Sequence, residues 1–292
     1  MPAEITIGTS VDAPIAALAQ AAGAAWQNVP YDAVEPEVLP TAQSYADHCR
    51  VHDIDLAHSV VARDASGRII GFAMLARRGE WGWCGDFGVV PEWRGQGIGH
   101  RMMEAFLEQA RLAGVRSVAL EVWGDNHPAR RIYERAGFCA RRELVALRAD
   151  AAALAASSGE GETVRVQPSD SSVLLDWFGQ EDAREMPTWE RQLWSLVATS
   201  DTRILVSLRD GGERALVVYR PADAFGRIML VRIGLAADAQ PTDAAALLRA
   251  AAADTPGAYF LGDEPQGSAI HHMLVGLGFR ELGPIVAMRR EL

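Results

Sequence analysis

The segment from Val90 to His100 has the residue types of an anion-binding loop. A run of strand-forming residues ends at Val90, Pro91 interrupts it, and Arg94-Gly-Gln-Gly-Ile-Gly99 then leads straight into a helical pattern. Glycines let a backbone approach a ligand closely, and the free amides and dipole of a helix N-terminus favour a bound phosphate. Arg94 and His100 add charge at the rim. The segment therefore predicts a pyrophosphate site, with a ligand-free glycine turn as the alternative.

Two other phosphate-binding patterns do not fit this segment. A P-loop needs a lysine after its last glycine, and all 28 basic residues of the chain are arginines. A dinucleotide-binding fingerprint follows the first strand of a βαβ unit, whereas this loop follows the fourth expected strand.

A second motif lies about 30 residues downstream. Asn126, Ala129, Tyr133 and Gly137-Phe138 have the spacing N-x-x-A-x-x-x-Y-x-x-x-G-F. With the glycine loop, which fits [Q/R]-x-x-G-x-[G/A], this segment resembles the GNAT acetyltransferase superfamily. The resemblance covers residues 4–148 well and 163–292 only in outline.

The resemblance implies that acetyl-CoA binds between two central strands that splay apart, and that an amine attacks the thioester directly in a ternary complex. The backbone of Val89 and Val90 would pair with the pantetheine arm, and the Val89 amide would polarise the acetyl carbonyl. Asn126 would contact the pantetheine or order the end of its strand. Tyr133 would protonate the departing thiolate, unless it is simply a core residue. The pyrophosphate would be held by the loop residues Arg94, Gly95, Gln96, Gly97, Ile98, Gly99 and His100.

A direct attack needs a group that takes a proton from the substrate ammonium. Alternation along Trp81–Val90 predicts that Asp86 is the sole carboxylate on a face of small residues, which includes Cys84. Glu121 on the neighbouring strand is the second candidate. Either carboxylate could act through a water or hold a cationic substrate, and the alternative for Asp86 is a solvated or arginine-paired residue. Cys84 has no adjacent histidine to activate it and is expected to be a buried small hydrophobe.

His48 and His52 lie four residues apart, a spacing that would allow one helix face to bind a metal. No third ligand follows at a recognisable spacing, so no metal is expected. The resemblance implies instead that residues 27–55, with Trp26, Tyr31 and the two histidines, form the acceptor pocket.

These residues must be positioned by strands that alternate with helices. The patterns predict strands at 5–8, 58–63, 68–76, 81–90, 118–123 and 139–147, and helices at 13–25, 98–113 and 128–136. Hairpins and crossovers together indicate an α/β fold with a mixed sheet.

The second half of the chain echoes the first. Residues 137–148 and 278–289 share Gly-Phe and a closing Ala-(Leu/Met)-Arg at identical spacing. We therefore expect two tandem GNAT-like domains, a catalytic one at 1–150 and a second at 163–292, joined by a linker at 151–162. The matching loop of the second half, residues 235–243, has carboxylates and no glycine. The second domain is expected to have lost acetyl-CoA binding and to serve in packing, acceptor-site shaping or homodimer formation.

The composition of the chain limits the classes of partner that it is expected to bind. The chain of 292 residues carries a formal charge of −10, which disfavours nucleic acid and suits a small-molecule amine. No signal sequence or membrane span is visible, and three scattered cysteines fit a cytoplasmic protein. The expected activity is acetyl-CoA-dependent N-acetyl transfer; the alternative is a non-catalytic acyl-CoA sensor or interaction module. Thiol-cofactor biosynthesis by a tandem protein is a third option, for which an intact motif in the second half would be expected.

Overall fold

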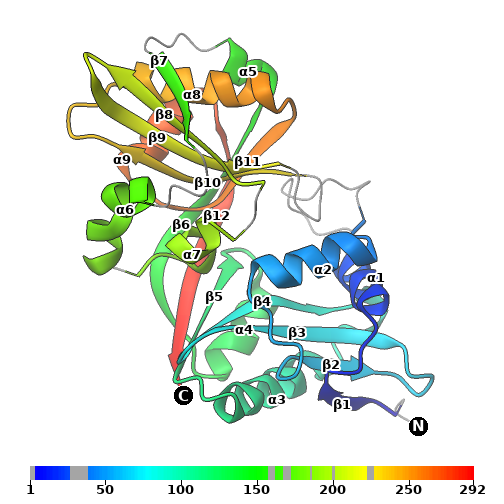
Figure 1. Cartoon of the computed structure of the whole chain (residues 1–292). Helices are drawn as coiled ribbons and strands as arrows, with labels where there is room; N and C mark the ends of the chain where they lie inside the picture. Colours follow the sequence, from blue (N-terminus) through cyan, green and yellow to red (C-terminus); the bar gives the residue numbers. More distant parts are fainter. Residues whose placement is uncertain are drawn as a thin grey trace. The chain divides into compact units, whose positions relative to one another are not determined.

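The computed structural model describes residues 4–26, 39–156, 162–166, 172–184, 186–198, 201–221 and 227–292. The chain divides into two compact units, and each contains a mixed sheet with helices packed against it (Figure 1). The first unit comprises Met1–Arg142 with Ile285–Leu292, and the second comprises Glu143–Pro284.

The sheet of the first unit has the strand order β1-β2-β3-β4-β5-β12. Neighbouring strands are antiparallel except β4 and β5, which run parallel. The strands are β1 (Thr6–Thr9), β2 (Val60–Arg63), β3 (Ile69–Arg78), β4 (Trp81–Val89), β5 (Ser117–Trp123) and β12 (Arg280–Glu291).

Helices cover both faces of this sheet. On one face lie α1 (Ile15–Trp26) and α2 (Ala42–Val51), and on the other lie α3 (Ile98–Leu112) and α4 (His127–Arg135) (Figure 1). The short helix η1 (Pro91–Trp93) connects β4 to the glycine loop. Met102 and Phe106 of α3 are fully buried against the sheet, and Leu18 of α1 and Tyr45 of α2 are buried on the opposite face. The sheet therefore has one hydrophobic core on each side.

The sheet of the second unit has the order β6-β11-β10-β9-β8-β7. In the part of the chain that is described, helix α8 is buried along most of its length and packs on β8 and β9. The remaining elements are β6 (Cys139–Asp150), α5 (Ala151–Ala155), β7 (Glu162–Val166), α6 (Ser172–Arg184), η2 (Trp189–Arg191), α7 (Leu193–Leu196), β8 (Arg203–Arg209), β9 (Gly212–Arg220), β10 (Ile228–Leu235), α8 (Pro241–Asp254), β11 (Ala258–Pro265) and α9 (Ala269–Gly276).

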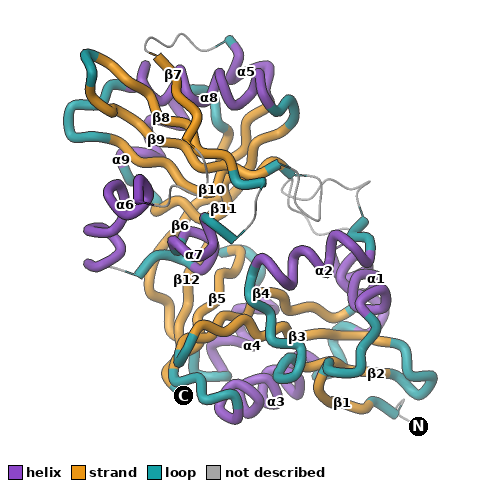
Figure 2. The backbone as a smooth tube through the Cα atoms, viewed as in Figure 1, coloured by secondary structure: helices purple, strands orange, loops and turns teal. Residues whose placement is uncertain are grey.

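The two halves of the sequence exchange their last strands. β6 follows α4 in the chain, but its residues from Leu144 to Asp150 pair with β11. β12, the last strand of the chain, pairs instead with β5, from Ile285–Trp123 to Glu291–Ser117 (Figure 2). The exchanged strands are the segments whose sequences echo one another. Periodicity showed that both are strands but could not show which sheet each one completes.

The expected division at residues 150 and 163 differs from the observed one for this reason. The first compact unit ends at Arg142 and regains the C-terminal eight residues. Ala151–Ala155, expected in the linker, form α5, which packs on α8 and buries Leu154. The rest of the expected linker, 157–161, lies outside the described residues. Across the described ranges, no helix has the length and apolar character needed to cross a membrane.

Candidate functional site

The central strands of the first unit separate midway along their length. β4 pairs with β5 only from Trp81–Ser117 to Trp83–Ala119. Beyond this point β4 continues to Val89 beside β3, and β5 continues to Trp123 beside β12, with no further pairing between them in the described structure. The backbone edge of each strand therefore faces the gap that the separation creates.

The glycine loop lies at the open end of β4. Gly95 and Gly97 have φ values of +76° and +77°, in the left-handed region that glycine adopts without strain. A Cβ atom at either position would meet no atom within 4 Å, so the space in front of the loop is open. Gly97 is the N-cap of α3, so its conformation directs the first amides of the helix toward that space.

Gly99 has a different role from the other two loop glycines. A Cβ atom there would lie 2.7 Å from Cδ1 of Ile132 in α4. Its missing side chain lets α3 approach α4 closely. The glycine pattern therefore combines two conformational requirements with one packing requirement.

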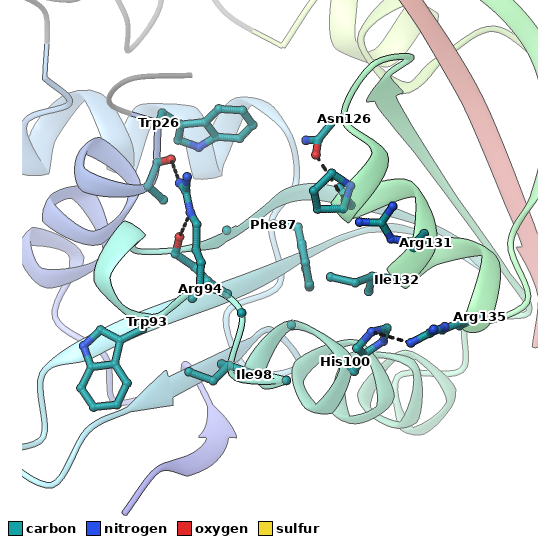
Figure 3. Close-up of a pocket in the computed structure, with 18 residues that line it drawn as sticks. Trp26, Phe87, Trp93, Arg94, Ile98, His100, Asn126, Arg131, Ile132 and Arg135 are labelled. Carbon is teal, nitrogen blue, oxygen red and sulfur yellow. Dashed lines mark hydrogen bonds between the residues drawn. The ribbon is translucent and has the colours of Figure 1, made fainter. Parts of the chain in front are cut away.

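A cavity of about 560 Å³ opens in front of the loop (Figure 3), a size typical of small-ligand sites. Its wall is formed by the end of α1, the end of β4, the loop, the start of α3 and one face of α4. Eight of the residues predicted for cofactor binding line it: Val89, Arg94, Gly95, Gly97, Ile98, Gly99, His100 and Asn126. Val90, Gln96 and Tyr133 are not among the lining residues.

Arg94 crosses the upper part of this cavity and makes two backbone contacts (Figure 3). Its Nε donates to the Val89 carbonyl at 2.9 Å, and its Nη2 donates to the Ala25 carbonyl at 2.7 Å. The side chain thus ties the loop to the C-terminal end of α1 instead of standing free at the rim. The backbone of Val90 is expected, with that of Val89, to pair with the pantetheine arm; its amide donates to the carbonyl of Ile70 at 3.0 Å.

Two cavity residues on α4, Arg131 and Arg135, were not predicted from the sequence. Nη1 of Arg135 lies 3.4 Å from Nε2 of His100 across the cavity mouth (Figure 3). With Pro128 and Ile132 they recur at helical spacing, so the signal was one face of a predicted helix. Three basic side chains therefore surround the loop, which suits a ligand with several phosphates.

Asn126 is the N-cap of α4, and its Oδ1 accepts a hydrogen bond from the Ala129 amide at 3.2 Å. Asn126 thus caps α4 and also lines the cavity. Tyr133 is buried, with ring centres 5.7 Å from Phe87 and 6.0 Å from Phe138. Burial, followed by the nearby Cys84, raises the Tyr133 pKa well above its usual value, so the hydroxyl stays protonated at neutral pH.

Asp86 does not share a face with Cys84, so the prediction from alternation is wrong on this point. In the register with β3, Met74 is opposite Asp86 and Leu75 is opposite Cys84, which leaves Gly85 as an extra residue in β4. Such a β-bulge reverses the alternation of side chains beyond it. Asp86 therefore faces α2, the side on which the ring of Trp83 lies against His52.

Asp86 is neither solvated nor paired with an arginine. It is 6% exposed, and its Oδ2 accepts a hydrogen bond from the Tyr45 hydroxyl at 3.2 Å. Nε2 of His48 lies 3.1 Å from the same oxygen. The second candidate carboxylate, Glu121, accepts a hydrogen bond from the indole Nε1 of Trp83 at 2.6 Å.

Cys84 lies on the opposite face of the sheet from Asp86 and is buried. Burial, and then the charges of Asp86 and Glu121, raise its pKa far above the usual thiol value. The thiol is therefore protonated at neutral pH, which disfavours a covalent acetyl-cysteine route. Tyr31, expected in the acceptor pocket, lies outside the described residues.

The corresponding region of the second unit is built differently. The loop before α8 has no glycine, and the buried Asp243 accepts a hydrogen bond from the Gln240 amide at 2.8 Å, closing the helix N-terminus with a carboxylate of the chain itself. β10 has a register shift between Leu230 and Arg232, as β4 has before Asp86. Arg232 is 1% exposed and pairs with Asp182 of α6 at 2.7 Å. The residue that follows the bulge is therefore Asp86 in the first unit. In the second unit it is Arg232, whose charge is paired with a carboxylate.

The sequence pattern of the Acetyltransferase (GNAT) family matches residues 23–138. A mycothiol acetyltransferase of Clavibacter michiganensis is 37% identical over 84 residues, which are 29% of this chain and 28% of that protein. N-alpha-acetyltransferase 30 of Schizosaccharomyces pombe is 36% identical over 63 residues, 22% of this chain and 42% of that protein. The matches thus span less than half of the length of these relatives.

Solved structures resemble the whole chain. A tandem GNAT protein from the clavulanic acid biosynthesis pathway has a TM-score of 0.71 at 14% identity, over 99% of this chain and 98% of its own. A GCN5-related N-acetyltransferase from Sphaerobacter thermophilus has a TM-score of 0.68 at 15% identity, over 98% and 95%. Residues 23–138, which contain both motifs, therefore match the Acetyltransferase (GNAT) family, and the whole chain has the fold of a tandem GNAT protein.

Proposed function

We propose that this protein transfers the acetyl group of acetyl-CoA to the amine of a small molecule. The observation that carries the proposal is the position of the open loop at Gly95 and Gly97 beside the gap between β4 and β5. A phosphate-bearing cofactor at the loop would extend its acyl arm along the unpaired edge of β4. The amine would then reach the thioester from the side of α2.

The first unit would supply three functions to this reaction. Amides at the start of α3, with His100, Arg131 and Arg135, would hold the phosphates. The buried carboxylate of Asp86 and the half-buried carboxylate of Glu121 would attract the substrate ammonium and assist its deprotonation. The Tyr133 hydroxyl would give a proton to the departing thiolate.

We assign no acetyl-CoA site to the second unit, because Asp243 occupies the helix N-terminus that a pyrophosphate would need. A carboxylate there repels an anion as well as filling the donor positions. The second unit would support the first through the exchanged strand β12.

Calorimetric titration with acetyl-CoA tests the proposal directly. One site per chain is expected, and Gly97→Ala should abolish or weaken it. Two sites would contradict the assignment of the second unit, and the absence of binding would contradict the proposed donor.

Turnover is then measured by release of free thiol with spermidine, tyramine, glucosamine and a dipeptide as acceptors. Because several relatives are named mycothiol acetyltransferases, the acceptor of those enzymes joins the panel. Binding of acetyl-CoA without acceleration by any amine would favour the non-catalytic sensor instead.

A further inference from the structure

We infer that His48 is the proton acceptor for the substrate ammonium and that Asp86 is its supporting carboxylate. The inference rests on the proposed function and deepens it, because it identifies the base and the charge of the acceptor. Neither histidine of α2 belongs to the motifs that define the acetyl-CoA site.

The geometry of the His48–Asp86 pair supports this assignment. Nε2 of His48 lies 3.1 Å from Oδ2 of Asp86, and the side chains are 15% and 8% exposed. The contact has the distance of an ion pair without the geometry of a hydrogen bond. The charge of the carboxylate still favours a proton on the nearer nitrogen, Nε2, and stabilises the imidazolium. The other nitrogen, Nδ1, is then the atom that accepts a proton. Of the two side chains, the imidazole is the more exposed.

The neighbours that α2 places around Asp86 also support the pair. The Tyr45 hydroxyl donates to Oδ2 at 3.2 Å. Burial, and then the charge of Asp86, raise the pKa of Tyr45, so it remains a donor across the neutral range. Burial and Asp86 likewise raise the pKa of Cys49 to about 12, so its thiol stays neutral. Both neighbours are therefore neutral at neutral pH, and neither adds a second charge beside His48 and Asp86.

The pair lies beside the point where β4 and β5 separate. The ring of His48 lies 4.5 Å from that of His52, which lies 5.6 Å from that of Trp83. Trp83 is the last residue of β4 that pairs with β5, and its indole Nε1 donates a hydrogen bond to Glu121. The titratable groups on the same face as the pair are Tyr45 and Cys49 of α2, His52 at the C-cap of α2 and Glu121 of β5. Cys84 of β4 lies near Asp86 but on the opposite face of the sheet.

An N–H bond of the ammonium breaks and its proton moves to Nδ1 of His48, while the carboxylate of Asp86, 3.1 Å from Nε2, balances the charge of the imidazolium. The nitrogen lone pair forms the bond to the thioester carbon, the C–S bond breaks, and the thiolate takes a proton from Tyr133. The second nitrogen proton replaces the one that Tyr133 gave, and the imidazolium releases its proton to solvent. The carboxylates of Asp86 and Glu121 favour a substrate amine that arrives as a cation.

The test is the pH dependence of kcat/KM for His48→Gln, measured with the amine that the wild-type protein acetylates fastest among spermidine, tyramine, glucosamine and the dipeptide. Glutamine can donate to Asp86 but cannot take a proton. We expect a loss of about 100-fold at pH 7, which shrinks toward parity as the pH passes the pKa of the amine itself. The Kd for acetyl-CoA should not change. A loss of equal size at every pH, or no loss, would overturn the inference.

The chain provides a matched control in His58→Gln. His58 Nδ1 lies 2.9 Å from Asp55 Oδ2, a second histidine–carboxylate pair outside this site. Its removal should leave kcat/KM and its pH profile unchanged. Asp86→Asn should lower kcat/KM by about 10-fold or more, and the double variant should be no worse than His48→Gln alone, since the two residues act as a unit.

Nuclear magnetic resonance of the histidine side chains provides a readout that needs no substrate. Asp86→Asn should lower the imidazole pKa of His48 by at least one unit, because the anion that stabilises the imidazolium is lost. The pKa of His58 should stay the same. An unchanged His48 pKa would refute the pair. If the wild-type protein acetylates no amine, the proposed function fails, and this measurement alone still decides whether the pair exists.

Discussion

At the scale of single residues, burial determines the protonation state of the groups around the separated strands. Tyr133 and Cys84 both have raised pKa values, and burial is the largest cause in each case. A raised pKa favours the neutral form, which makes the phenol a proton donor but makes the thiol a poor nucleophile. The same environment therefore supports one residue in its predicted role and disfavours the other as a covalent intermediate.

Tyr133→Phe should lower kcat by about 10- to 100-fold while the Kd for acetyl-CoA stays within 2-fold, because loss of a general acid affects only the departure of the thiolate. Since the hydroxyl stays protonated, its loss by ionisation should not appear in the wild-type rate profile below about pH 10. Steady-state kinetics with calorimetry measure both. A kcat equal to that of the wild type would show that Tyr133 is only a core residue.

Cys84→Ala should retain kcat within about 3-fold, because its thiol is protonated at neutral pH and buried. Mass spectrometry of the wild-type protein after rapid mixing with acetyl-CoA should find no acetylated Cys84. Accumulation of an acetyl-thioester on this residue would require a covalent route in place of direct attack.

At the scale of elements, the glycine loop and the helix after it depend on two kinds of glycine. Gly97 has a left-handed backbone at the start of α3, whereas Gly99 leaves room for Ile132 of α4. The first property concerns the direction of amides and the second concerns the distance between helices. Substitutions at the two positions should therefore have different consequences.

Gly97→Ala should raise the Kd for acetyl-CoA by at least 10-fold. A side chain in the left-handed region costs about 1–2 kcal/mol, which either destabilises the fold or moves the amides away from the ligand. Gly67→Ala, at a turn with a similar φ of +84° and no atom near the added Cβ, is the control for stability alone. Equal acetyl-CoA affinity in both variants would mean that the loop does not hold the ligand. Calorimetry and thermal unfolding measure the two effects.

At the scale of the whole molecule, the exchange of β6 and β12 makes each sheet depend on both halves of the sequence. Arg289 of β12 donates to the Ser117 hydroxyl at 2.7 Å, and its guanidinium lies 4.4 Å from the ring centre of Trp81. Met288 is buried in the core of the first unit. The last strand therefore supports β5, the strand that carries Glu121, although it contributes no residue to the cavity.

Deletion of residues 285–292 should abolish acetyl-CoA binding. It exposes the edge of β5 and removes Met288 from the core, so the midpoint of thermal unfolding should fall by more than 10 °C for a loss of several kcal/mol. Met288→Leu, which keeps the volume, should change little. Undiminished binding by the truncated chain would show that the first unit is complete without β12.

The sequence by itself determined the site motifs, because their residues are close along the chain. The glycine loop, the helix after it and the Asn126–Tyr133 spacing are local patterns, and local geometry decides their conformation. Asp86 was found as a buried-strand carboxylate, but its face was predicted wrongly because one bulged residue, Gly85, reverses every side chain beyond it. Arg131 and Arg135 were visible only as the face of a helix.

Tertiary structure alone decided which groups meet. The Tyr45–Asp86 contact joins residues 41 positions apart, and the pairing of β12 with β5 joins residues more than 160 positions apart. Neither contact can be predicted from the periodicity of the sequence. Each depends on which sheet edge a strand joins, and the residue pattern within the strand does not determine that edge. Since residues 137–148 and 278–289 have nearly the same pattern, either strand suits either edge. The packing of the whole chain determines which sheet edge each of the two strands joins.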